Sequence, residues 1–331
     1  MKNNLFKNIE LTELHVHVGS SVSPNDLWEI AHSQGLQLPT KDYWEFSQMV
    51  TIHEKKGYEE YLKMYDLLEK IQSSPEAIFQ ATQTAIAGAY KKNNVAKLEL
   101  RFNPILRCRQ GEMDLDHIIV YALHGMERAM LKYPVKCGLI LSLDRRFSEE
   151  ENAGIVKKAI KYKKRGIVGV DLAGPTQLND NSKSFKPQSI AHLIIKAKKA
   201  GLGITIHTGE ATDCKEMWEV VNNLKPDRIG HGVACVNDTK LMKHLSKKGI
   251  VLETCPSSNL NTKTIKDLKQ LAEVYKKLLK NNVLFTINTD GPELQRTTLI
   301  HEYELLLTNN ILTRKELLTS NKVASEASFI I

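Results

Sequence analysis

Several histidines and an acidic residue stand at the ends of short apolar segments in this sequence, where they could bind a metal ion. His15 and His17 close the segment LTELHVHV, and residues at i and i+2 of a strand project from the same face. Further apolar segments end in the same way, with His207, His231 and Asp290. Imidazole and carboxylate donors without a thiolate suit Zn²⁺ and also Fe²⁺, Mn²⁺ or Co²⁺. We therefore expect a catalytic rather than a structural metal.

Such a metal keeps one position for water and lowers the pKa of that water to about 7, which yields a hydroxide nucleophile. Two neighbouring groups remain for proton transfer. His231 could take the proton of the water or orient it, and Glu210 could protonate a ring nitrogen of the substrate. A carboxyl group in a dry pocket has a raised pKa, as a proton donor needs. Packing alone would not explain so many polar groups at strand ends, because burying them is costly.

Eight apolar segments are the predicted strands that position these residues. They cover residues 11–18, 95–102, 135–143, 167–174, 202–209, 227–232, 249–255 and 283–290. Most are nearly continuous runs of Val, Ile and Leu, which is typical of buried parallel strands. Amphipathic segments of crossover length lie between them. The pattern predicts an α/β fold, a (β/α)₈ TIM barrel with the metal residues at its carboxyl end. An open doubly wound sheet is the alternative.

One long insertion separates the first two predicted strands. Residues 19–94 include Ser23-Pro24 and Ser74-Pro75, each an N-cap serine followed by proline at the first helical position. Residues 58–71 form a strongly amphipathic segment. We expect extra helices here, acting as a lid beside the barrel mouth, and a single domain over residues 1–331.

Composition narrows the class of protein. The chain has 331 residues, 42% of them hydrophobic and 25% charged, and no apolar run approaches the about 18 residues of a membrane span. We expect a cytoplasmic protein whose five widely spaced cysteines stay reduced. The net charge of +8 could indicate a nucleic-acid surface, but lysines in 156–166 and 268–282 follow predicted helix exteriors. No nucleic-acid or membrane partner is expected, and nothing specifies an oligomeric state.

Beyond these patterns, the sequence resembles the adenosine deaminase family of the amidohydrolase superfamily. The motifs ELHVHV, VDLAG, HTGE, RIGHG, CPSSN and NTD occur in the order of that family, and LELRFNP and NKVASEASF are similar too. The resemblance covers almost the whole chain. It implies that one Zn²⁺ per chain is held by His15, His17, His207 and Asp290.

The resemblance also implies the roles of the other site residues. Glu210 corresponds to the proton donor to purine N1, His231 to the histidine that works on the water, and Asp290 also holds that water. The backbone N–H of Gly174 reaches purine N3, and His17 contacts the substrate as well. The implied reaction is hydrolytic deamination of a 6-aminopurine nucleoside, from adenosine to inosine and ammonia.

Three departures from the family concern the substrate rather than the metal, one of them Pro175-Thr176 in place of Asp-Glu after VDLAG. Gly19 replaces an aspartate that meets the 5′-hydroxyl end of the sugar, which would leave more room there, and Gly291 replaces an aspartate that meets purine N7. A site that loses a hydrogen-bond partner relaxes or redirects its specificity. The alternative substrates are therefore aminodeoxyfutalosine, 5′-methylthioadenosine and S-adenosylhomocysteine.

Two other functions compete with this reading. One is hydrolysis of another cyclic amidine or amide, as in other members of the superfamily. Members with two metals usually bridge them with a lysine at the end of strand four, where this chain has Asp171, so a single metal is favoured. The other is nucleoside binding or signalling without catalysis. The presence of Glu210, His231 and Asp290 argues against it.

Overall fold

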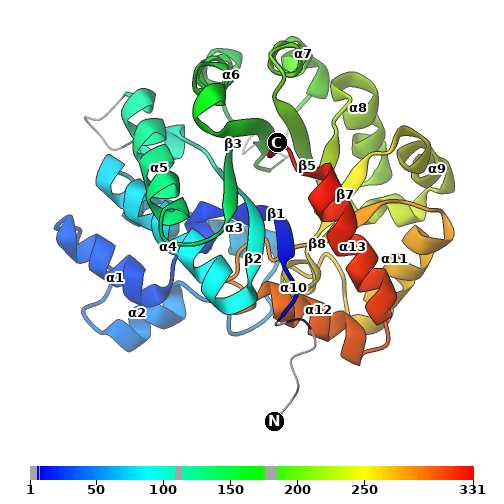
Figure 1. The fold of residues 1–331 in the computed structure, drawn as a ribbon, viewed down its shortest axis with the longest axis horizontal. Coiled ribbons are helices and arrows are strands. Elements are labelled where there is room, and N and C mark those ends of the chain that lie inside the picture. The colour runs from blue at the N-terminus through cyan, green and yellow to red at the C-terminus, as the bar shows by residue number, and fades with distance from the viewer. Residues whose placement is uncertain (1–5, 7, 109–113, 176–184) are drawn as a thin grey trace.

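Eight parallel strands ringed by helices make up the computed structural model, which describes residues 6, 8–108, 114–175 and 185–331 (Figure 1). The strands are β1 (Leu11–His17), β2 (Val95–Phe102), β3 (Lys136–Asp144), β4 (Ile167–Ala173), β5 (Gly203–Thr208), β6 (Arg228–His231), β7 (Val251–Thr254) and β8 (Phe285–Ile287). Each strand pairs in parallel with the next one along the chain. All eight predicted strands are present, and the predicted α/β TIM barrel is confirmed.

The barrel is closed by contacts between β1 and the segment that follows β8. The N–H of His17 donates to the carbonyl of Asp290 (2.8 Å), and the N–H of Asp290 donates to the carbonyl of His15 (3.0 Å). The amide oxygen of Asn288 accepts from the N–H of Leu14 (3.0 Å). The last strand is shorter than the predicted 283–290, because on the β1 side a side-chain contact of Asn288 interrupts the ladder before Asp290. Asp290 itself has a left-handed backbone with φ of 66°.

The helices outside the insertion follow the strands; those between two strands are crossovers, and the last two come after β8. They are α5 (Leu115–Met130), α6 (Glu149–Tyr162), α7 (Ala191–Lys199), α8 (Cys214–Leu224), α9 (Thr239–Lys248), α10 (Pro256–Asn261), α11 (Leu268–Lys280), α12 (Leu299–Thr308) and α13 (Arg314–Ala327). Short 3₁₀ helices are η1 (Val18–Ser20), η2 (Ile105–Arg107), η3 (Lys163–Arg165), η4 (Pro187–Ile190) and η5 (Val233–Asn237). In α11, Leu271, Val274, Tyr275 and Leu278 are buried, so its lysines lie on the outer face as the sequence predicts. No described helix is long and apolar enough to span a membrane.

The insertion after β1 is helical, as predicted. It contains α1 (Pro24–Ser33), α2 (Tyr43–Met49), α3 (Tyr58–Ile71) and α4 (Pro75–Asn93). The hydroxyls of Ser23 and Ser74 cap α1 and α4 by accepting from backbone N–H groups. Helix α4 packs against β2 and α5 and serves as the crossover helix, so α1 to α3 are the additional elements.

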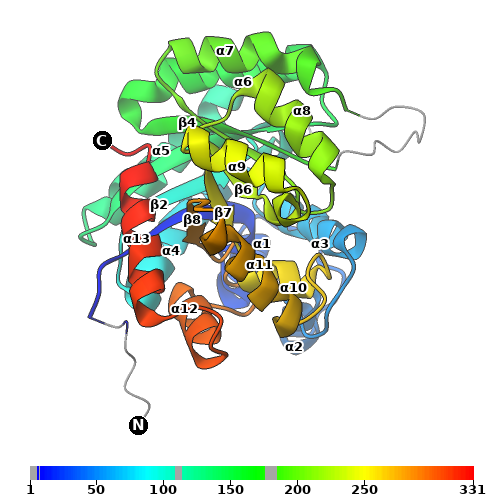
Figure 2. The same cartoon turned by 90° about the vertical axis from the view of Figure 1, so that its right-hand side faces the viewer.

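The C-terminal segment covers the end of the barrel where the strands begin. Figure 2 shows α13 running along the side of the barrel before the chain ends. The Phe329 ring stacks on the Arg228 guanidinium, 3.6 Å from its centroid, and a Cβ on Gly203 would collide with this ring. Glu99 accepts hydrogen bonds from the Phe329 N–H (2.5 Å) and from the Ser328 hydroxyl (2.8 Å). This end of the barrel is thereby closed, and the opposite end carries the polar cluster.

Candidate metal centre and active site

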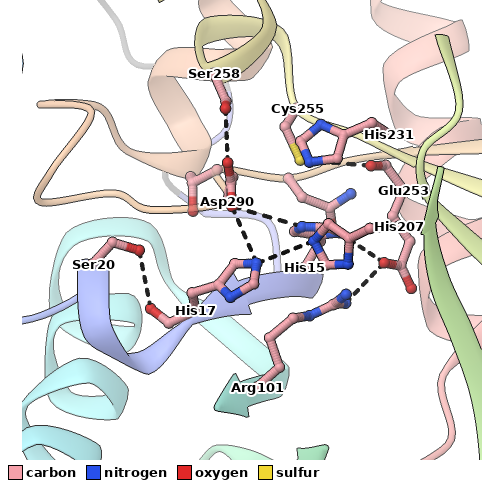
Figure 3. Close-up of polar contacts among 12 residues, drawn as sticks. His15, His17, Ser20, Arg101, His207, His231, Glu253, Cys255, Ser258 and Asp290 are labelled. Atoms are coloured by element: carbon pink, nitrogen blue, oxygen red, sulfur yellow. Dashed lines mark hydrogen bonds and ion pairs between the residues drawn. The ribbon is translucent and has the colours of Figure 1, made fainter. Parts of the chain in front are cut away.

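Four residues from three parts of the barrel meet at its carboxyl end (Figure 3). His15 and His17 belong to β1, His207 belongs to β5, and Asp290 follows β8. Nε2 of His17 lies 3.2 Å from Nε2 of His207. Oδ1 of Asp290 lies 3.4 Å from Nε2 of His17 and 3.7 Å from Nε2 of His15. The structure thus brings together the four residues expected to bind the metal.

The outer nitrogens of two of these rings are engaged by buried carboxylates. Nδ1 of His15 lies 2.8 Å from Glu253 and Nδ1 of His207 lies 2.9 Å from Asp171. In a neutral ring this contact fixes the proton on Nδ1, so the lone pair of Nε2 points at the shared centre. Nε2 of His15 is buried and has no hydrogen-bond partner among the described residues. A buried polar atom left this way costs about 1–3 kcal/mol, and a divalent cation at the centre would satisfy it.

The protonation states of the cluster also fit a metal. Burial lowers the pKa of His17 well below its ordinary value and lowers the pKa of His207 as well, so both rings are neutral near pH 7. Burial and Arg101 lower the pKa of His15, but its contacts with Asp290 and Glu253 outweigh them and raise it. Burial opposes ionisation of Asp290, yet the neighbouring histidines hold its pKa well below the ordinary value. His17 and His207 therefore offer neutral imidazoles beside the ionised carboxylate of Asp290.

A second group of potential ligands is less suitable. His15, His231 and Cys255 also bring donor atoms within 4.8 Å of one another. Cysteine binds metals as the thiolate, and burial, followed by nearby carboxylates, raises the pKa of Cys255 well above its ordinary value. The histidine and aspartate set is therefore the better candidate.

Glu253 organises the interior below the cluster and was missed by the sequence analysis. It accepts from Arg101 Nη2 (2.8 Å), Arg228 Nε (2.6 Å) and Thr205 Oγ1 (2.9 Å). Its side chain is fully buried in β7. The sequence did contain a sign of this role: a carboxylate stands inside the apolar segment 249–255. A carboxylate buried in a strand needs polar partners, so its position predicts a buried network.

Asp290 has two further partners, both hydroxyl groups. Its Oδ2 accepts from Ser258 (2.7 Å) and from Tyr61 (3.0 Å). Ser258 belongs to the CPSSN motif, whereas Tyr61 lies in α3 of the insertion and was not anticipated. The sequence feature that could have indicated this role is the spacing of Tyr58, Tyr61 and Tyr65, which places them along one face of an amphipathic segment.

Glu210 and His231 face each other beside the cluster. Oε2 of Glu210 lies 3.6 Å from Nε2 of His231. Burial, followed by the carboxylate of Asp290, raises the pKa of Glu210 well above its ordinary value, which favours the protonated form that a proton donor needs. Burial lowers the pKa of His231 well below its ordinary value. Nδ2 of Asn259 donates to Nδ1 of His231 (3.0 Å), which leaves the proton of the neutral ring on Nε2, toward the site.

The cluster opens into a cavity of about 890 Å³. His17, Glu210, His231 and Asp290 line it together with Gly174 at the end of β4. Gly174 has a φ of +87°, and a Cβ there would lie 2.5 Å from Asp144, so this position requires glycine.

Comparison with known proteins identifies the family. The family model described as adenosine deaminase matches residues 11–331. An adenosine deaminase of Clostridium kluyveri is 30% identical over 306 residues, which covers 92% of this chain and 85% of the relative. The chain belongs to the adenosine deaminase family. The enzyme is thus a hydrolytic deaminase, as its sequence motifs predict.

Solved structures agree with the barrel fold of this deaminase. An adenine deaminase from Arthrobacter aurescens superposes with a TM-score of 0.84 at 22% identity, covering 96% of this chain and 93% of that one. The Arabidopsis protein ADAL, in complex with GMP, gives a TM-score of 0.81 at 25% identity, covering 98% of this chain and 93% of its own.

The two glycines that depart from the family lie close to side chains of other elements in this deaminase. A Cβ on Gly19 would lie 2.9 Å from both Arg107 Nη2 and Glu69 Oε1. A Cβ on Gly291 would lie 2.6 Å from the Cβ of Ser20, whose hydroxyl accepts from Tyr65 (3.1 Å). Arg107 and Glu69 thus occupy part of the corner beside Gly19, which still lines the cavity.

Proposed function

We propose that this deaminase removes the 6-amino group of a purine nucleoside by hydrolysis and uses one Zn²⁺ per chain. Conversion of adenosine to inosine and ammonia is the simplest such reaction. The main support is the convergence of three imidazole Nε2 atoms and the Asp290 carboxylate beside Glu210 and His231 in one cavity. Fe²⁺, Mn²⁺ and Co²⁺ accept similar donors, so metal analysis is needed to distinguish them.

His15, His17, His207 and Asp290 would hold the metal. When bound, such a metal lowers the pKa of a coordinated water and supplies hydroxide near neutral pH. The remaining catalytic work belongs to side chains. Glu210, which keeps its proton because its pKa is raised, protonates purine N1 and makes C6 electrophilic. Nε2–H of His231 orients the attacking oxygen and stabilises the charge that develops on it.

Substrate positioning falls to groups on the cavity wall. The backbone N–H of Gly174 donates to purine N3, and His17 packs beside the reacting end of the purine; both line the cavity. We propose that the insertion 19–94 acts as a lid, because Tyr58, Tyr61 and Tyr65 of α3 also line it. Excluding water there would strengthen the electrostatic interactions inside. Residues 1–331 would then work as one catalytic domain.

A larger nucleoside is the second candidate substrate. Small-molecule sites usually measure about 300–1,000 Å³, so the cavity of about 890 Å³ is at the large end. That volume favours 5′-methylthioadenosine, S-adenosylhomocysteine or aminodeoxyfutalosine over adenosine alone. Hydrolysis of a different cyclic amidine has no comparable support.

We also propose that the enzyme works in the cytoplasm on a small molecule and not on nucleic acid. Cys137, Cys214, Cys235 and Cys255 are free thiols, which suits a reducing compartment. Exposed lysines pair with surface carboxylates, as Lys161 does with Asp116 (2.8 Å).

The direct test is a screen of 6-aminopurine nucleosides by the ultraviolet change of deamination and by ammonia release. We expect turnover with metal-loaded enzyme, and a loss of about 10²- to 10⁴-fold in kcat for Glu210→Gln. Glu219→Gln on α8, which does not line the cavity, is the matched control. Binding of one zinc with no ammonia from any aminopurine would contradict the proposal.

A further inference from the structure

Three carboxylates in the cavity wall, Asp66, Glu69 and Asp144, have no part in the proposed proton transfers. Helix α3 turns Tyr58, Tyr61, Tyr65 and Glu69 toward the cavity, at spacings of three and four residues that place them on one face. Tyr61 contacts Asp290 and Tyr65 contacts Ser20. Glu69 lies farther along this face, beside Gly19.

Glu69 is held in a two-pronged ion pair with Arg107. Arg107 Nη2 lies 2.9 Å from Oε1 of Glu69, and Arg107 Nε lies 2.8 Å from Oε2. The arginine side chain is 0% exposed and the glutamate side chain is 18% exposed. The guanidinium therefore lies behind the carboxylate, and the carboxylate is the member of the pair that a ligand can reach.

Folding stability does not explain this pair well. Burial lowers the pKa of Arg107 and raises that of Glu69, and their mutual attraction opposes both shifts. Removing two charges from water costs about as much as their attraction returns, so buried ion pairs are weak contributors to stability. A pair of this kind on a ligand cavity points to recognition.

The chemistry of the exposed member defines what it can recognise. An ionised carboxylate only accepts hydrogen bonds, and because Oε2 of Glu69 is buried against Arg107, Oε1 is the oxygen left to accept from a ligand. Hydroxyl groups are complementary donors, whereas a phosphate would be repelled. The corner is available only because residue 19 is glycine, since a Cβ there would crowd both partners at 2.9 Å.

Resting on the proposed function, we propose that Glu69, positioned by Arg107, accepts a hydrogen bond from a sugar hydroxyl of the nucleoside. Glu69 is then a specificity-determining residue supplied by the inserted helix. The substrate class becomes a nucleoside with that hydroxyl free, and not a nucleoside 5′-phosphate.

This contact is tested by a thermodynamic cycle that combines a substitution in the protein with removal of one hydroxyl group from the substrate. We would measure kcat/KM for adenosine and for 2′-, 3′- and 5′-deoxyadenosine with the wild type and with Glu69→Ala. A hydrogen bond to a charged group is worth about 10- to 100-fold. We expect one deoxy analogue to lose that factor in the wild type and nothing further in Glu69→Ala. Glu60→Ala, exposed on α3, should behave as the wild type.

A second variant covers the case in which Arg107 without its partner disturbs folding. In Gly19→Asp/Glu69→Ala, an aspartate can pair with Arg107 in the emptied corner, since Gly19 is outside the left-handed region. This variant should restore discrimination between the same two nucleosides.

Three results would overturn the inference. They are an equal loss for all four nucleosides in Glu69→Ala, no discrimination by the wild type, and a higher kcat/KM for AMP than for adenosine. If no nucleoside is deaminated, the proposed reaction fails by itself. In that case the same cycle is measured with the Kd values of inosine and its deoxy analogues, determined by calorimetry. These values still test whether Glu69 accepts a hydrogen bond from a sugar hydroxyl.

Discussion

Replacing Asp171 by asparagine should weaken metal binding while the barrel stays folded. Oδ1 of Asp171 lies 2.9 Å from Nδ1 of His207, and its Oδ2 lies 3.4 Å from Arg101. The asparagine oxygen can still accept from Nδ1, so the ring keeps its orientation. What disappears is the negative charge that makes the opposite nitrogen a stronger donor.

The expected magnitude follows from that single loss. Hydrogen bonds to charged groups contribute about 1.5–3 kcal/mol and neutral ones about 0.5–1.5 kcal/mol. The difference, about 1.4 kcal/mol, corresponds to about tenfold in the zinc dissociation constant. Asp171→Ala also frees the ring and should cost up to about 100-fold. In both variants the buried Arg101 keeps its ion pair with Glu253 (2.8 Å). Because its charge still has a partner, we expect both variants to fold.

Competition with a chromophoric chelator measures the affinity, and circular dichroism checks the fold. Asp144→Asn is the matched control, because Asp144 also ends a strand but pairs with Arg146 (2.7 Å) and not with a histidine. Its zinc affinity should equal that of the wild type. Wild-type affinity in a folded Asp171→Asn, or an equal loss in Asp144→Asn, would show that the carboxylate does not act through His207.

Other parts of the structure give further predictions. Glu210 must be protonated to act, and its pKa is raised, so kcat/KM should fall as the pH rises through that raised value; a pH profile in which Glu210→Gln lacks this fall checks it. Tyr61→Phe removes a donor to Asp290 and should lower kcat/KM about tenfold at unchanged zinc content. Phe329→Ala removes the ring stacked on Arg228 and should lower the free energy of unfolding in urea by about 2 kcal/mol, with unchanged zinc affinity.

The barrel, and the convergence of the residues proposed to hold the metal, were accessible from sequence because both depend on local patterns. Buried parallel strands are apolar along their length, and the polar residues at their ends stand out against that background, as His207 and Asp290 do. The helix starts at Ser23 and Ser74 follow from capping chemistry that needs no tertiary information. In this fold, chain order fixes the strand order, so these residues had to meet at one end.

The supporting groups were harder to find because their roles depend on three-dimensional packing. Tyr61 and Glu69 belong to an inserted helix whose position relative to the barrel is not encoded by strand order. Nothing in the local pattern around Gly19 reveals that Glu69 fills the adjacent space, 50 residues along the chain. The end of β8 was also misplaced: toward β1 the side chain of Asn288 accepts from Leu14, and backbone contacts resume only at Asp290.

One interior arginine links the two carboxylates that support the proposed metal ligands. Arg101 contacts Glu253 at 2.8 Å and Asp171 at 3.4 Å, and these two carboxylates engage His15 and His207 respectively. Its charge helps to hold the pKa of both carboxyl groups below their ordinary values against the opposing effect of burial. Both carboxylates therefore stay ionised and keep both rings with Nε2 directed at the centre. All these groups come from β1, β2, β4, β5 and β7, so the register of the strands sets their relative positions. The inserted helix α3 contributes instead to the wall of the substrate cavity.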